Sequence, residues 1–175
     1  MVDRSRLVTV VFAVAVVLAV GAVVVASNPT ILPTGEYDRT TVTLVDNDTD
    51  ETLATVSVRV ANTRPKRITG LSDTDALGAN EGMLFVHDAE DDHAYVMRDM
   101  AFPIDIVFVD TAGRITAIHH AELPPERTSN DDLRRYRGRG KYVLEVPYNY
   151  TSERGVDVGD RVRIDGEWAV ETEVS

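Results

Sequence analysis

The sequence predicts a mainly β domain with short helices, an α+β fold in which an antiparallel sheet or partly closed barrel follows one N-terminal transmembrane helix. Three observations lead to this prediction. Residues 7–26 form an uncharged, valine-rich run. Beyond them, short stretches alternate β-branched with polar residues and are separated by Gly, Asn and Asp. A chain of 175 residues holds one domain of ordinary size plus an appendage, so we expect a single core.

The N-terminal run fits one membrane-spanning helix. Residues 7–26 contain no ionisable group, and at about 1.5 Å per residue they cover roughly the thickness of a bilayer's hydrocarbon core. Arg4 and Arg6 precede the span, which places the N-terminus in the cytoplasm and the domain outside it. We therefore expect an uncleaved signal anchor over residues 1–26, with the cell membrane as partner. A cleaved signal peptide, whose apolar region is usually shorter, is the alternative.

Residues 27–38, with two prolines and a glycine, predict a linker, followed by a globular domain over residues 39–168 and a tail over residues 169–175. Residues 40–45 and 52–61 predict a β-hairpin around an Asp/Asn-rich turn. Residues 64–71 predict a short helix. Further strands are predicted at residues 83–86, 94–97, 104–110, 114–119, 142–146 and 161–164, with a helical turn at 151–154. Residues 106–109 are apolar on both faces, which is typical of a central strand.

The composition excludes several classes of function. With 18 basic and 29 acidic residues the net charge is −11, so we expect no nucleic-acid partner. Such a surface suits high salt, in which self-repulsion is screened, although an ordinary acidic solvated surface is the alternative. The chain has no cysteine, which excludes disulfides, thiolate metal sites and a cysteine nucleophile.

Several blocks of sequence resemble a known family. Residues 81–86 read EGMLFV, residues 103–110 read PIDIVFVD, and residues 142–146 and 155–162 read YVLEV and GVDVGDRV. In this order and spacing, over about residues 53–165, they resemble the domain of unknown function 192 family. The resemblance implies a small β-rich domain, often exported or membrane-tethered, with no established activity and with a suggested carbohydrate-related or envelope role.

The chain also departs from this family. Residues 95–100 read YVMRDM where the family has FWMKNT, and Ser72 follows Gly70 and Leu71 where the family has methionine. The tryptophan, the lysine and the amide–hydroxyl pair are therefore missing. If those groups hold a ligand in relatives, this protein binds it differently or not at all.

The best ligand-binding candidates lie around this segment. A strand, a short loop and a returning strand would bring Arg98, Asp99 and Asp105 together. An arginine beside two carboxylates can orient a sugar or another polyol, and a desolvated carboxyl can act as a general acid. Met83 and Met97 complete the candidate set. The alternative is a structural role, in which Asp105 caps a turn and pairs with Arg98.

A basic cluster supplies the interaction candidates, Arg134, Arg135, Arg137 and Arg139. It could bind anionic lipid headgroups, an acidic glycan or an acidic protein. The alternative is a mobile loop whose charges meet Asp131 and Asp132.

Metal and serine chemistry have weaker support. His119, His120 and Glu122 are metal-ligand residue types, but only His120 and Glu122 share a strand face, so we expect no metal and no cofactor. No serine lies in a G-x-S-x-G turn. The serines at positions 57, 72, 129 and 152 lack an evident partner histidine, which argues against a serine hydrolase.

The leading functional hypothesis is a non-catalytic ligand-binding or cell-envelope interaction module. It rests on the absence of a recognisable nucleophile, complete metal set or phosphate loop in the sequence. The alternative is a carboxylate-dependent hydrolase that acts on an envelope glycan through Asp99 and Asp105.

Overall fold

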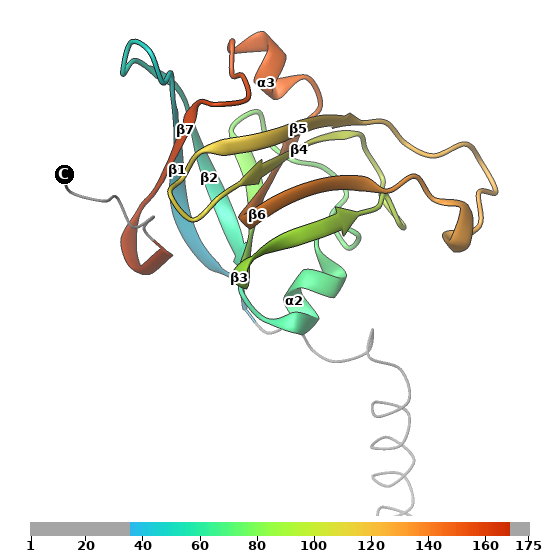
Figure 1. The fold of residues 1–175 in the computed structure, drawn as a ribbon. Coiled ribbons are helices and arrows are strands. Elements are labelled where there is room, and N and C mark those ends of the chain that lie inside the picture. Colours follow the sequence, from blue (N-terminus) through green and yellow to red (C-terminus); the bar gives the residue numbers. More distant parts are fainter. Residues whose placement is uncertain (1–35, 169–175) are drawn as a thin grey trace, which may run out of the picture. The chain divides into compact units, whose positions relative to one another are not determined.

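The computed structural model describes residues 36–168 (Figure 1). The predicted anchor over residues 1–26, nearly all of the predicted linker and the tail lie outside the described residues. Within residues 36–168, each helix falls short of the length and apolarity needed to cross a membrane.

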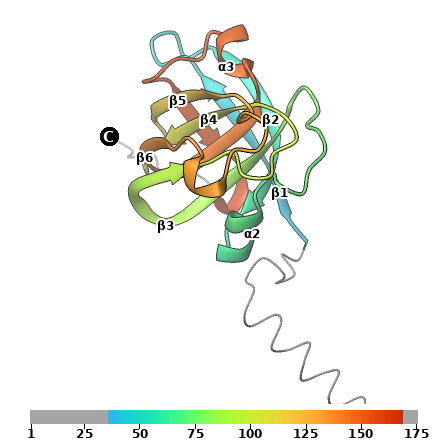
Figure 2. The same cartoon turned by 90° about the vertical axis from the view of Figure 1, so that its right-hand side faces the viewer.

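Seven strands form one mixed sheet in the order β5-β4-β6-β3-β2-β1-β7, which curls into a half-barrel (Figures 1 and 2). Two short helices, α2 and α3, lie at opposite ends of the domain in both views. The elements are β1 (Asp38–Val45), β2 (Thr52–Ala61), α2 (Arg64–Thr69), β3 (Glu81–Tyr95), β4 (Ile104–Val109), β5 (Ile115–Ala121), β6 (Tyr136–Pro147), α3 (Tyr150–Glu153) and β7 (Arg161–Ile164). The predicted mainly β class with short helices is confirmed.

The predicted hairpin is β1 and β2, which pair antiparallel with Val42 opposite Val56. Its turn forms because the Asp46 carboxylate accepts hydrogen bonds from the backbone N–H groups of Asp48 and Thr49, at 2.9 and 2.7 Å. The hydrogen bonds from Thr49 hold the pKa of Asp46 below its ordinary value. Local turn chemistry and residue alternation therefore determine this part of the sheet.

The prediction of an antiparallel sheet is wrong at one place, because β2 and β3 pair parallel, with Val58 opposite Gly82. The connection between them contains α2, whose N-cap Thr63 accepts from the Lys66 N–H and whose chain turns at Gly70 with φ 53°. A parallel pair needs such a crossover. Residues 83–86 and 94–97, predicted as two strands, belong largely to the single strand β3, which is irregular between Val86 and Asp91.

Each face of the sheet carries its own core. One cluster includes Leu44, Leu84, Val107, Leu144 and Tyr150. The other includes Met83, Phe85, Met97, Phe108 and Val143. β4 contributes to both and is buried along its whole length, as the apolar run at residues 106–109 predicted.

The two outer strands of the sheet meet at one end of the half-barrel. Ile115 N–H donates to the Asp160 carbonyl at 2.9 Å, and Val162 N–H donates to the Gly113 carbonyl at 2.7 Å. These bonds link the start of β5 to the start of β7, and Arg114 and Arg161 form an isolated bridge. The sheet is thus partly closed there.

Candidate functional site

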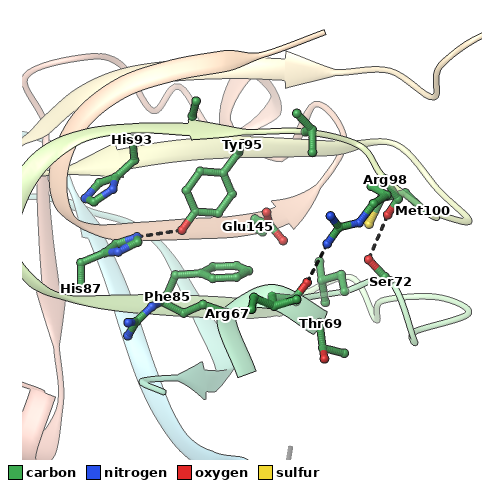
Figure 3. Close-up of a pocket in the computed structure, with 15 residues that line it drawn as sticks. Arg67, Thr69, Ser72, Phe85, His87, His93, Tyr95, Arg98, Met100 and Glu145 are labelled. Atoms are coloured by element: carbon green, nitrogen blue, oxygen red, sulfur yellow. Dashed lines mark hydrogen bonds between the residues drawn. The ribbon is translucent and has the colours of Figure 1, made fainter. Parts of the chain in front are cut away.

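A cavity of about 310 Å³ opens on the face of the sheet that carries the second core cluster (Figure 3). Its walls come from α2 and the turn that follows it, from β3 and the segment after it, and from one residue of β6. Among the side chains that line it are Arg67, Phe85, His87, His93, Tyr95, Arg98 and Glu145.

Glu145 is the unusual residue of this cavity. On β6 its neighbours Leu144 and Val146 belong to the opposite core, so alternation along the strand turns Glu145 toward the cavity. The residue is 6% exposed, lines the cavity, and makes no hydrogen bond or ion pair with any residue in 36–168. Burial raises its pKa to about 8, so the carboxyl is mostly protonated at neutral pH. Burying a polar group without a partner costs free energy, which makes this residue a candidate for function.

Aromatic groups line one side of the cavity. The rings of Phe85 and Tyr95 meet edge to face with centroids 5.1 Å apart, and the rings of His87 and His93 stack at 3.6 Å. His87 Nε2 and the Tyr95 hydroxyl are hydrogen-bonded at 2.9 Å. Burial, with the nearby charges of His93 and Arg67, lowers the pKa of His87 to about 4, so this imidazole is neutral at pH 7. Burial raises the pKa of Tyr95, so its phenol stays protonated.

Two arginines bring positive charge to the cavity. Arg98 Nη2 donates to the Ile68 carbonyl at 3.1 Å, and the Ser72 hydroxyl donates to the Arg98 carbonyl at 2.9 Å. Arg67 Nη1 donates to two backbone carbonyls, at 3.1 and 2.8 Å. Figure 3 shows the carboxyl of Glu145 facing the space between Tyr95 and Arg98. The cavity therefore offers a neutral carboxyl, an aromatic wall and fixed guanidinium groups.

The sequence-predicted cluster of Arg98, Asp99 and Asp105 does not form. Arg98 lines the cavity, but Asp99 is exposed with φ 55°, and Asp105 is fully buried on the other face of the sheet. The reason is strand alternation in β4, in which Ile104 and Ile106 join the core beside the cavity and Asp105 points away from it. Met97 and Met83, which are 3% and 0% exposed, lie in that core and do not line the cavity.

Asp105 instead binds α3 and β5. Its Oδ1 accepts from His120 Nδ1 at 2.7 Å and from the Asn149 N–H at 3.0 Å. Its Oδ2 accepts from the N–H and the hydroxyl of Thr151, at 2.9 and 2.7 Å. Asp105 also does not pair with Arg98, which was the structural role predicted as the alternative for this residue. The four hydrogen bonds also leave Asp105 poorly suited to act as a general acid on a glycan.

The interaction candidates are exposed, and two of the four lie in a strand, while Arg134 and Arg135 lie in the segment that precedes it. Arg137 and Arg139 belong to β6, where Arg139 lies opposite Asp92 of β3 and pairs with Glu90 at 2.9 Å. Arg134 lies over the Tyr136 ring at 5.1 Å, and Arg135 is exposed. The one ion pair found for these arginines within residues 36–168 is thus made by Arg139 with Glu90 of β3, and not with the predicted Asp131 or Asp132.

Sequence reasoning missed Glu145 because it belongs to the run YVLEV, whose residues by themselves indicate only a strand and a family motif. A glutamate inside a run that is apolar on both faces is itself a signal of a buried carboxyl. The statement about serines was wrong for Ser152, whose hydroxyl lies 3.3 Å from His120 Nε2. As predicted, His119 and His120 point to opposite faces: His119 contacts the Tyr136 and Phe108 rings and His120 contacts Asp105. In the described part of the chain, no three metal-ligand side chains are grouped to hold an ion.

Comparison with known proteins places the fold among uncharacterised domains. A family described as DUF192, Uncharacterized ACR, matches residues 45–164. A structure from Sinorhizobium meliloti 1021, described as a candidate transcription regulator, has a TM-score of 0.65 and 25% identity and covers 74% of this chain and 95% of its own. A protein of unknown function from Novosphingobium aromaticivorans DSM 12444 has a TM-score of 0.62 and 25% identity, with coverages of 75% and 89%. No curated protein matches the chain.

Proposed function

This chain belongs to the domain of unknown function 192 family, and we propose that its domain is a ligand-binding module that takes a sugar-sized polyhydroxy compound in the cavity around Glu145. The observation that carries the proposal is the buried, unpartnered carboxyl of Glu145 at a cavity of about 310 Å³. Binding sites for small molecules are typically concave and largely apolar, with a few polar groups that fix orientation.

The chemistry of the cavity favours hydroxyl groups over other ligands. A protonated carboxyl donates one hydrogen bond and accepts others, which is also what a sugar hydroxyl does. The Phe85 and Tyr95 rings offer an apolar surface for the carbon skeleton of the ring. Arg67 and Arg98 oppose a cationic ligand and suit a neutral or acidic sugar. Nucleic acid is not part of the proposal, because a net charge of −11 repels phosphate.

Calorimetric titration of the full-length protein with a panel of hexoses and hexuronic acids at pH 6.5 tests this function. Glu145→Leu should weaken binding about tenfold or more, because it removes the hydrogen bonds made by the carboxyl. Glu145→Gln should retain binding, because an amide also donates and accepts. Wild-type affinity should fall as the pH rises through about 8, the pKa of Glu145, whereas the Gln variant should stay constant.

Glu122→Gln changes an exposed carboxylate elsewhere on the domain and is the matched control. The proposal fails if none of the sugars binds. It also fails if Glu145→Leu binds them as tightly as the wild type, because the ligand would then lie elsewhere.

We further propose that the segment at residues 7–26 anchors the domain in the membrane and holds it outside the cytoplasm. On that side the domain meets an envelope glycan or protein. The exposed arginines at 134, 135, 137 and 139 are available there to an acidic partner. The valine-rich run and the preceding Arg4 and Arg6 support this placement. Because the chain has no cysteine, a single introduced cysteine is the one thiol that a reagent can label, and its labelling shows on which side of the membrane that position lies. In intact cells a membrane-impermeant maleimide should label Asp131→Cys and spare Arg4→Cys. The reverse pattern would overturn the orientation.

A further inference from the structure

A second group of reactive side chains lies on the face of the sheet opposite Glu145. His120 on β5 is the cross-strand neighbour of Asp105 on β4, so the two side chains share a face. His120 Nδ1 lies 2.7 Å from Asp105 Oδ1, and His120 Nε2 lies 3.3 Å from the Ser152 hydroxyl of α3. A hydroxyl, an imidazole and a buried carboxyl are thus connected in series, with Ser152 exposed to solvent.

The hydrogen bonds around Asp105 determine the tautomer of His120. The carboxylate already accepts from two backbone N–H groups and from the Thr151 hydroxyl. It therefore acts as an acceptor toward His120, whose Nδ1 must carry the proton. In the neutral imidazole, Nε2 is then unprotonated and can accept the proton of the Ser152 hydroxyl. This is the arrangement that makes a serine a nucleophile.

A cavity of about 430 Å³ adjoins these groups. Ser152 and His120 line it together with the apolar side chains of Ile118, Val156 and Val158 on one part of the wall and the polar side chains of Thr151 and Asp157 on another. Val158 is 60% exposed, which is unusual for a large apolar residue of this domain. An apolar wall beside a nucleophile suits a short acyl chain.

We propose that Ser152 and His120 are catalytic residues that cleave short-chain carboxylic esters, and that Asp105 is the positioning residue of His120. The Ser152 Oγ forms a bond to the ester carbonyl carbon while His120 Nε2 takes its proton. The carbon–oxygen bond to the alcohol then breaks, and the alcohol leaves with that proton. Water attacks the acyl-serine by the same route, which releases the carboxylic acid and restores Ser152. The sequence argument against a serine hydrolase missed this site because the serine lies in a helical turn and meets its histidine only through the fold.

The first test is labelling of the purified full-length protein with a fluorophosphonate, which is read by intact mass and peptide mapping. We expect one adduct, at Ser152, and none in Ser152→Ala. His120→Gln should slow labelling about 100-fold or more, the range expected for loss of a general base. Ser129→Ala is the matched control, because Ser129 is also an exposed hydroxyl but donates to Asp132 at 2.7 Å and contacts no histidine. It should be labelled like the wild type.

The second test is hydrolysis of p-nitrophenyl butyrate. Ser152→Ala should abolish turnover. Asp105→Asn should lower kcat about 100-fold at unchanged KM, after correction for the folded fraction, since substrate contacts are retained while the histidine loses its orientation. The proposal is overturned if the folded protein is not labelled at Ser152. It is equally overturned if His120→Gln is labelled at the wild-type rate, or if turnover survives in Ser152→Ala.

Discussion

Glu145 and Asp105 are two buried carboxyls on neighbouring strands, and the domain treats them in opposite ways. In the pairing of β4 with β6, Asp105 lies opposite Val146 and Ile106 lies opposite Glu145. The offset of one residue turns the two carboxyls to opposite faces of the sheet. Asp105 receives four hydrogen bonds, whereas Glu145 receives none from residues 36–168.

The difference shows that burial alone does not decide what a carboxyl does. Donors from α3 and β5 fix Asp105, so it can hold an imidazole in one orientation. Glu145 lies among apolar and aromatic groups, so burial raises its pKa and leaves its hydrogen-bonding capacity to a ligand. The first carboxyl is held by donors of the domain itself, and the second keeps its hydrogen-bonding capacity for a ligand in the cavity.

The largest effect on stability should come from Asp105→Asn. An amide cannot accept all four hydrogen bonds, and its NH₂ group would face backbone donors, so we expect a loss of about 3–5 kcal/mol in the free energy of unfolding. Urea denaturation measures this loss. Asp99→Asn, at an exposed position, should stay within about 0.5 kcal/mol of the wild type. A loss below about 1 kcal/mol for Asp105→Asn would mean that its hydrogen bonds contribute little.

Glu145→Gln should change stability with the opposite sign, and its effect should grow as the pH rises from 4.5 to about 8. The pKa of Glu145 is raised from 4.5 to about 8 in the fold, so the folded state binds the proton more tightly than the unfolded state does. The resulting stabilisation is present below pH 4.5 and is lost as the pH rises through about 8. The free energy of unfolding of the Gln variant, minus that of the wild type, should therefore be about 2–4 kcal/mol larger at pH 9 than at pH 4.

Urea denaturation at both pH values measures this gain, and Glu122→Gln is again the control. If the difference in unfolding free energy between the Gln variant and the wild type is the same at pH 4 and pH 9, Glu145 is not desolvated in solution.

A smaller effect should come from His87, on the wall of the same cavity. Its pKa is lowered from 6.5 to about 4, so protonation favours the unfolded state as the pH falls from 6.5 to 4. His87→Gln should lose less stability over this range than the wild type, by about 1 kcal/mol for a half-exposed ring. Thermal unfolding at pH 7 and pH 4 measures it. Tyr95→Phe removes the hydroxyl partner without removing the imidazole and should keep the acid sensitivity of the wild type.

The sequence predicts those parts of the fold that depend on near neighbours. The hairpin of β1 and β2 follows from alternating residues and from a turn in which Asp46 binds groups two and three residues away. The parallel pairing of β2 with β3 depends on how α2 returns the chain, and no local pattern contains that information.

The same limit explains the candidate sites. Arg98, a predicted ligand-binding residue, lines a cavity, but its predicted partner Asp105 binds residues 15, 44 and 46 positions further along the chain. Neither the tertiary position of α3 nor the face to which Asp105 points could be read from residues 95–105 alone. Ser152 was set aside for the same reason, since 32 residues separate it from His120.

The pairing of β7 with β1 affects when the sheet can be completed during synthesis of the chain. β7 pairs with β1, and the Thr40 hydroxyl donates to the carbonyl of Asp165, 125 residues later, at 2.8 Å. Contacts of such high sequence separation slow folding, because a long loop must close before they form. During synthesis, β1 must therefore wait with one edge unpaired until residues 161–164 have emerged from the ribosome. Over that interval the nascent chain presents a free strand edge, which makes it a natural client for chaperones.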